Sequence, residues 1–145
     1  MTDYKRIRYA VRDRIAEITM IREPVNAIDM VLAQEVVHAY GRVREDPGVR
    51  AVILTSGCRQ AFSAGMDLKM IRGKTGLDLR NFLEVLYFGM HDAQYRLGKP
   101  SIAAINGPAR AAGVTLAVSC DLIVAADNID ISYHGLSFQN SRLYF

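Results

Sequence analysis

A turn of small residues reads Ala61-Phe62-Ser63-Ala64-Gly65-Met66-Asp67-Leu68-Lys69, and it follows the apolar run Ala51-Val52-Ile53-Leu54. A short apolar run of this kind is typical of a buried β-strand, and the residues after the turn have a helical pattern. The turn therefore connects a strand to a helix. α/β domains with parallel strands are built from connections of this type.

A second turn repeats this arrangement further along the chain. It reads Ile105-Asn106-Gly107-Pro108-Ala109-Arg110-Ala111-Ala112-Gly113-Val114, and it follows the apolar run Ser101-Ile102-Ala103-Ala104-Ile105. If the two strands are parallel neighbours, both turns open on the same edge of the sheet and can aim two backbone N–H groups at one point. Two such donors form a site for a carbonyl oxygen that becomes negative during a reaction. Alanine-glycine turns also serve merely as connections, but two of them after two buried strands favour the site.

The rest of the chain continues the alternation of strands and helices. The predicted strands cover residues 4–11, 14–21, 49–54, 102–105, 121–125 and 129–133, and we expect the strand over 121–125 to be buried. The first predicted helix begins after Asn26 or Asp29, either of which can cap it, and ends at about residue 45. Further helices are predicted over residues 67–71, 77–96 and 111–119. Phe82, Leu86, Met90 and Tyr95 are among the expected core positions of the long helix over 77–96. This succession predicts a single α/β domain with parallel strands.

Composition and charge narrow the classes of function. The chain has 145 residues, of which 50% are hydrophobic, and its formal net charge is +3. This charge excess is too small to indicate a nucleic-acid partner. Basic residues near the start, at Lys5, Arg6, Arg8, Arg12 and Arg14, alternate with apolar ones. These residues either form the solvent-exposed face of a strand or attract an anionic ligand such as a phosphate-bearing cofactor.

The sequence gives no indication of a metal site or of a membrane segment. The two cysteines, Cys58 and Cys120, do not form a disulfide framework or a metal-ligand pattern. The first residues lack the apolar core of a signal peptide, and polar residues interrupt the most apolar region of the chain. We therefore expect reduced thiols, a cytoplasmic location and no membrane partner.

Several segments together resemble the enoyl-CoA hydratase/isomerase (crotonase) family. The resemblance rests on Pro24-Val25-Asn26-Ala27-Ile28, on residues 46–55, on the two turns with the strands before them, and on residues 119–127. The order and spacing of these segments also match, and the resemblance extends from about Ile15 to Ile131. The motifs are specific to the family, but they do not distinguish one reaction of the family from another.

The resemblance implies a spiral of repeated ββα turns, assembled into trimers or pairs of trimers. It implies an acyl-CoA thioester as the ligand, with coenzyme A entering as part of the substrate and no other cofactor. Because family members are considerably longer, we expect an incomplete spiral: residues 1–145 form one crotonase-like domain that matches the N-terminal part of the family domain. The tail over 134–145 matches no family pattern.

The resemblance also assigns roles to individual residues. By position, the backbone N–H groups of Met66 and Ala112 are the two oxyanion donors, and the second position is often glycine in the family. The positions that match the coenzyme A site of the family are Val25, Ala27, Ala64, Met66, Asp67, Leu68, Pro108 and Ala112. Asp67 has an alternative role as the cap of its short helix, and Asp121 is expected to be structural.

The chain departs from the family at the two positions where the hydratases carry a catalytic glutamate. Thr115 occupies the first position and Gly135 matches the second. His134 is the nearest candidate to replace them, because imidazole transfers protons near neutral pH, although a packing or surface role is the alternative. Two functions remain: an enzyme that hydrates enoyl-CoA or moves its double bond through an oxyanion-stabilised enolate, and a non-catalytic or truncated family member that binds acyl-CoA or partner subunits.

Overall fold

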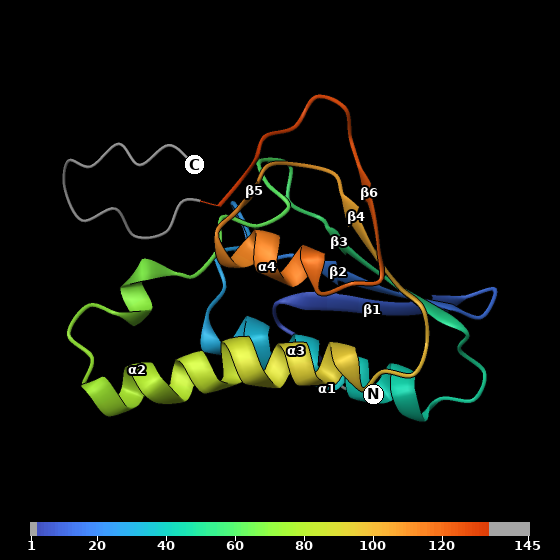
Figure 1. Ribbon diagram of the computed structural model, residues 1–145, viewed down its shortest axis with the longest axis horizontal. Helices are drawn as coiled ribbons and strands as arrows, with labels where there is room; N and C mark the ends of the chain where they lie inside the picture. The colour runs from blue at the N-terminus through green and yellow to red at the C-terminus, as the bar shows by residue number, and fades with distance from the viewer. Residues whose placement is uncertain (1–2, 134–145) are drawn as a thin grey trace.

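A five-stranded sheet forms the centre of the computed structural model, which describes residues 3–133 (Figure 1). The strands are β1 (Ile7–Arg12), β2 (Ile15–Met20), β3 (Ala51–Ser56), β4 (Ser101–Ile105) and β6 (Leu122–Ala125). Their order in the sheet is β1-β2-β3-β4-β6. β1 pairs with β2 as an antiparallel hairpin, and all other pairs are parallel. The predicted α/β class with parallel strands is confirmed.

Helices follow most of these strands. They are α1 (Met30–Glu45), η1 (Leu68–Met70), α2 (Gly76–Leu83), η2 (Glu84–Gly89), α3 (Met90–Tyr95) and α4 (Ala112–Val118). Asp29, rather than Asn26, caps α1, because its side chain accepts a hydrogen bond from the N–H of Leu32. α2, η2 and α3 form one continuous helical rod, in which η2 is a π-helical turn.

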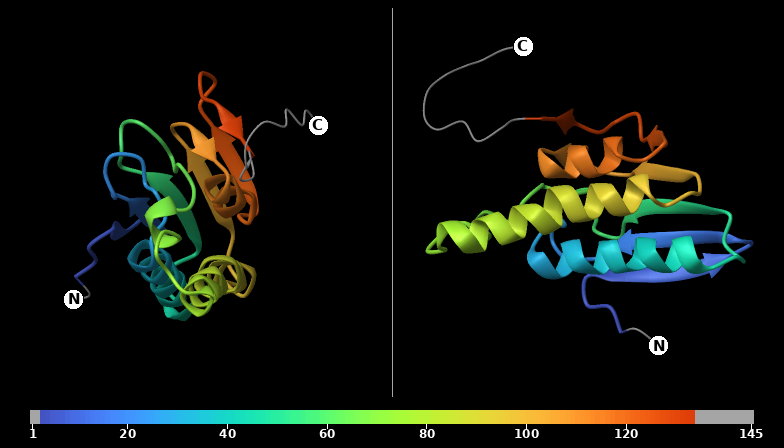
Figure 2. Two further views of the ribbon diagram at one scale, coloured as in Figure 1. Left: turned by 90° about the vertical axis from the view of Figure 1, so that its left-hand side faces the viewer. Right: turned by 60° about the horizontal axis from the view of Figure 1, so that its bottom comes forward.

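The core lies between the sheet and the pair of helices formed by α1 and the rod. These two helices lie side by side below the sheet (Figures 1 and 2). Leu32, Val36 and Val43 recur at helical spacing on the buried side of α1, and Leu54 of β3 faces them as part of the same cluster. Burial of each such side chain stabilises the fold by about 1.5–3 kcal/mol relative to exposure.

Each main-sheet strand from β2 onward leads into a short extended segment outside the sheet. β5 (Ala109–Arg110) follows β4, and β7 (Ile131–Ser132) follows β6. β5 and β7 pair in parallel, Ser63 forms a bridge to Ala109, and Ile28 forms a bridge to Met66. A helix follows the first three of these segments. The repeat is therefore strand, short segment and helix, and the short segments of successive repeats lie beside one another.

Two predictions about burial are wrong. The strand over 121–125 was expected to be buried, but Leu122 and Val124 of β6 are 59% and 64% exposed. Among residues 3–133, β6 is an edge strand of the sheet and has β4 as its one neighbour. Tyr95 was expected in the core and is 90% exposed. Residues four apart share one face of an α-helix, so Gln94, four residues after the buried Met90, is buried instead, and Tyr95 points away from that face.

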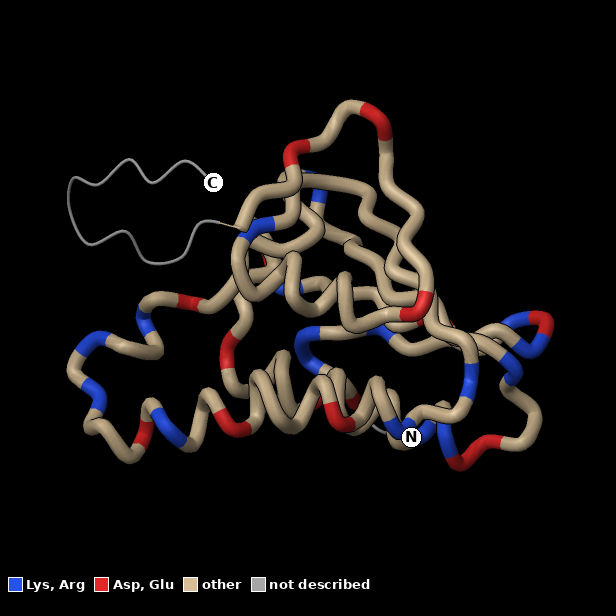
Figure 3. The backbone as a smooth tube through the Cα atoms, in the orientation of Figure 1, with Lys and Arg blue, Asp and Glu red and all other residues tan. Residues whose placement is uncertain are grey.

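The basic residues of the first hairpin are only partly free. Arg6 forms an ion pair with Asp29, and Arg14 donates a hydrogen bond to the carbonyl of Gly48. Figure 3 shows acidic residues interspersed with basic ones at the hairpin and along the helices. Among residues 3–133, no helix has the length and apolar character needed to cross a bilayer.

Candidate active site

The first turn is held open by a glycine with a left-handed backbone. Gly65 has a φ of 88°, a conformation that residues with a β-carbon rarely adopt. Its carbonyl accepts a hydrogen bond from the N–H of Ile28 at 2.7 Å, and the N–H of Asp67 donates to the carbonyl of Ile28 at 2.9 Å. This alternation leaves the N–H of Met66 on the other side of the segment.

The second turn contains an unusual alanine. Ala111 has φ 46° and ψ −119°, outside the regions that alanine normally occupies, and it directly precedes Ala112, the first residue of α4. The carbonyl of Ala111 accepts from Val114 and Thr115, and its N–H donates to the carbonyl of Ser132. This backbone geometry is a feature that sequence reasoning missed, because a run of alanines gives no indication of a positive φ.

The two turns lie against each other. A β-carbon placed on Gly65 would lie 2.8 Å from the carbonyl oxygen of Arg110 and 3.2 Å from the amide nitrogen of Ala112. A side chain at residue 65 would therefore cover the Ala112 amide. Within residues 3–133, neither Met66 nor Ala112 donates its N–H to another protein group. Both amides remain available to an acceptor.

The other positions assigned to coenzyme A by the resemblance lie on three adjoining segments. The carbonyl of Val25 accepts from the N–H of Ala64 at 2.9 Å, and the carbonyl of Pro108 accepts from the N–H of Phe62 at 2.9 Å. The carbonyl of Ala27 accepts from a guanidinium nitrogen of Arg22 at 2.7 Å. The structure thus brings together the segments 25–28, 62–68 and 108–112. Leu68, which is 56% exposed, lies at the outer end of the middle segment.

Asp67 caps the short helix η1, which was the alternative role predicted for it. Its side chain accepts from the N–H of Lys69 at 3.0 Å and thereby caps η1. It also forms an ion pair with Arg22 at 2.6 Å, and Arg22 forms a second ion pair with Asp29 at 2.9 Å. Burial raises the pKa of Asp67, but the Lys69 N–H and the Arg22 guanidinium outweigh burial and lower its pKa.

Asp121 is structural, as expected. It accepts from both the N–H and the hydroxyl of Ser101 at 2.7 Å, which ties the start of β4 to the start of β6. These hydrogen bonds lower the pKa of Asp121. Ser101 is at the amino end of β4, whereas the two turns follow the carboxyl ends of the strands.

Neither catalytic glutamate position supplies a carboxylate within the described residues. Thr115 is half-buried on the first turn of α4, and its hydroxyl donates back to the carbonyl of Ala111 at 3.4 Å. Gly135 and His134 lie outside the described residues. His91 bonds to the hydroxyl of Ser119, and burial lowers its pKa, while His38 bonds to Tyr4. These histidines hold packing and surface positions.

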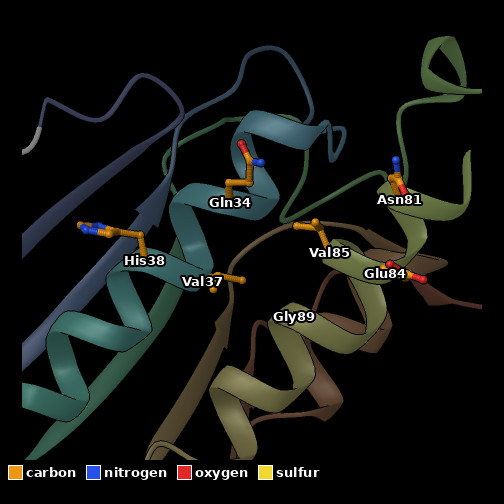
Figure 4. Close-up of a pocket in the computed structure, with 7 residues that line it drawn as sticks. All are labelled: Gln34, Val37, His38, Asn81, Glu84, Val85 and Gly89. Atoms are coloured by element: carbon orange, nitrogen blue, oxygen red, sulfur yellow. The ribbon is translucent and has the colours of Figure 1, made fainter. Parts of the chain in front are cut away.

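A groove on another part of the described chain lies away from the two turns. It has a volume of about 620 Å³ and lies between α1 and the helical rod, lined by Gln34, Val37 and His38 of α1 and by Asn81, Val85 and Gly89 of the rod (Figure 4). It shares no residue with the two turns. Both cysteines are buried and unpaired, and no group of three or more potential metal ligands occurs in residues 3–133.

Comparison with known proteins agrees with this arrangement. The family pattern described as enoyl-CoA hydratase/isomerase matches residues 11–139. A protein named putative enoyl-CoA hydratase from Thermus thermophilus is 38% identical over 112 residues, which are 74% of this chain and 43% of that protein. Carnitinyl-CoA dehydratase from Citrobacter koseri is 40% identical over 114 residues, 79% of this chain and 43% of that protein.

Solved structures show the same fold. The enoyl-CoA hydratase from Bacillus anthracis superposes with a TM-score of 0.83 at 29% identity, covering 89% of this chain and 50% of that one. The crystal structure of an enoyl-CoA hydratase from Geobacillus kaustophilus gives a TM-score of 0.86 at 26% identity, covering 91% of this chain and 50% of that one. The chain thus spans about half the length of the proteins that it matches. It belongs to the enoyl-CoA hydratase/isomerase family.

Proposed function

We propose that the chain binds an acyl-CoA thioester with its carbonyl oxygen between the N–H groups of Met66 and Ala112. The observation that carries this proposal is the contact between the two turns, which brings Gly65 against the Ala112 amide. Among residues 3–133, neither the Met66 N–H nor the Ala112 N–H has a protein acceptor. Coenzyme A is part of the substrate here, and no separate cofactor takes part. Segments 25–28 and 64–68, together with Pro108, are the proposed walls for the coenzyme A portion.

Two amide donors favour a reaction that passes through an enolate. When a base removes an α-proton, or water adds to the β-carbon of an enoyl thioester, the electron pair moves onto the thioester oxygen. Two N–H donors stabilise that oxygen, and one donor of this kind is worth about 3 kcal/mol of the barrier. The names of the relatives, an enoyl-CoA hydratase and carnitinyl-CoA dehydratases, favour addition or removal of water over other reactions of this type. Movement of the double bond uses the same enolate.

Calorimetry with butyryl-CoA and with free coenzyme A tests the binding proposal. Butyryl-CoA is saturated, so it cannot be hydrated during the measurement. We expect butyryl-CoA to bind more tightly than free coenzyme A, because only the thioester offers a carbonyl to the two amides. Equal affinity for the two ligands, or no binding of butyryl-CoA at millimolar concentration, would contradict the proposal.

A second candidate function is binding of acyl-CoA without turnover. It is favoured by Thr115, whose hydroxyl is a poor general base and donates back to its own helix. Loss of the enoyl absorbance of crotonyl-CoA measures hydration and separates the two candidates. Turnover that disappears in a His134→Ala variant supports the enzyme, whereas binding without hydration or isomerisation supports the binder. A trimer or a pair of trimers is the proposed assembly, and analytical ultracentrifugation tests it.

A further inference from the structure

Ser63 lies between the two turns, and we propose that it is a positioning residue that sets the spacing of the Met66 and Ala112 amides. This inference rests on the proposed function, because it concerns the geometry of the same donor pair. Ser63 is completely buried, with an exposed fraction of 0%, so it does not reach substrate itself. It acts through the backbone on either side of it.

The hydroxyl of Ser63 fixes the first turn. Its oxygen accepts a hydrogen bond from the N–H of Gly65 at 3.1 Å, and its proton is donated to the carbonyl of Asn26 at 2.8 Å. These two bonds define the direction of the hydroxyl group. Gly65 is the neighbour of Met66, so the bond to the Gly65 N–H restrains the peptide units that carry the first donor.

The backbone of Ser63 fixes the second turn. Its carbonyl accepts from the N–H of Arg110 at 3.0 Å, two residues before Ala112. A β-carbon on Gly113, the residue after Ala112, would lie 2.7 Å from both the β-carbon and the carbonyl oxygen of Ser63. Ser63 therefore touches the chain before and after the second donor, and only glycine fits at residue 113 without a shift.

Asn26 holds this serine in place from behind. It is completely buried, with a left-handed φ of 47°, and its amide nitrogen lies within hydrogen-bond distance of the Ser56 hydroxyl and the Phe62 carbonyl. Its side-chain oxygen accepts from the N–H of Arg22 at 2.7 Å. With its side chain anchored on three segments, Asn26 presents its carbonyl to Ser63 in a fixed direction.

Ser63 thus links both proposed donors. In a variant without its hydroxyl, both N–H groups remain, but the distance between them should change. Hydrogen-bond stabilisation of a developing oxyanion depends on donors that are held at the right position in advance. Displacement by a fraction of an ångström weakens polarisation of the carbonyl while the walls for coenzyme A stay in place. Affinity and polarisation should therefore separate in variants of Ser63.

The test uses butyryl-CoA labelled with ¹³C at the thioester carbonyl. In the unaltered protein we expect its carbon resonance to move downfield on binding, because two N–H donors polarise the carbonyl. In Ser63→Ala we expect more than half of that downfield shift to be lost, while affinity measured by calorimetry falls by no more than about tenfold. Ser63→Cys keeps a weaker polar atom at the same place and should retain more of the shift than Ser63→Ala.

Ser101→Ala is the matched control. Ser101 is also buried, and its hydroxyl also makes two hydrogen bonds, but both go to Asp121 at the other end of the sheet. It should lose stability without losing the shift. A full shift in folded Ser63→Ala, or an equal loss in Ser101→Ala, overturns the positioning role alone. If Ser63→Ala does not fold, a full shift in folded Ser63→Cys counts against the role and a reduced shift supports it. Absence of any shift in the unaltered protein overturns the proposed function as well.

Discussion

At the scale of single residues, the site depends on backbone positions that have little side chain. Gly65 and Ala111 both have positive φ values, and they lie one residue before the two proposed donors, Met66 and Ala112. Residues in such conformations concentrate at functional sites, where surrounding contacts maintain them. A positive φ is easily accommodated by the glycine, because it has no β-carbon. The sequence could not predict such a φ at the alanine, because alanine usually indicates a helix.

Ala111→Gly should stabilise the protein. Relief of the β-carbon strain at φ 46° gains about 1–2 kcal/mol, and the greater freedom of glycine in the unfolded chain costs about 0.5–1 kcal/mol. The expected net gain is about 0.5–1 kcal/mol in chemical denaturation. Ala93→Gly, at a half-buried helical position in α3, serves as the control and should lose about 1 kcal/mol. Destabilisation by Ala111→Gly would contradict the assigned backbone conformation.

Asp67 should make the fold sensitive to acid. The pKa of Asp67 in the folded protein is lower than that of an aspartate in the unfolded chain, which is about 4. Below that pH the unfolded state binds a proton more readily, so stability falls as the pH drops through the folded-state pKa. In Asp67→Asn we expect thermal midpoints to depend less on pH below about 4. An unchanged slope in that range would show that Asp67 is not held by Arg22 and Lys69 in solution.

At the scale of elements, the predicted succession of strands and helices is confirmed, and the errors have local causes. Both turns were predicted at the correct residues, because apolar runs followed by small residues can be recognised in a sequence. Tyr95 was misplaced because it is aromatic but lies five residues after the buried Met90, whereas the polar Gln94 occupies the i+4 position on the buried face. β6 was taken as buried because an apolar run does not reveal whether a strand has a neighbour on both sides.

Gly113→Ala should separate the two turns. A methyl group there would lie 2.7 Å from Ser63, so α4 or the first turn must shift, and we expect a loss of about 1–3 kcal/mol in unfolding free energy. Gly41→Ala is the control, since it is also helical and has no neighbour within 4 Å of the added carbon. It should gain about 0.5–1 kcal/mol from helix propensity. If both variants gain stability in urea denaturation, the two turns are not in close contact.

At the scale of the whole molecule, the spiral arrangement explains why two segments 46 residues apart in sequence form one site. Met66 and Ala112 belong to successive repeats, and their short segments are neighbours because the parallel strands β3 and β4 are neighbours. The resemblance led to Met66 and Ala112 as the proposed donors by position, but the sequence alone could not predict the hydrogen bonds of Asn26 and Ser63. Those bonds depend on segments that meet only in the folded chain.

The most direct measurement is of the two amides themselves. In ¹⁵N-labelled protein titrated with butyryl-CoA, the N–H protons of Met66 and Ala112 should both move downfield, because both donate to the thioester oxygen. Free coenzyme A, which has no thioester carbonyl, should leave these two resonances much less changed. Binding of butyryl-CoA that moves neither resonance, or only one of them, would contradict a carbonyl site formed by the pair.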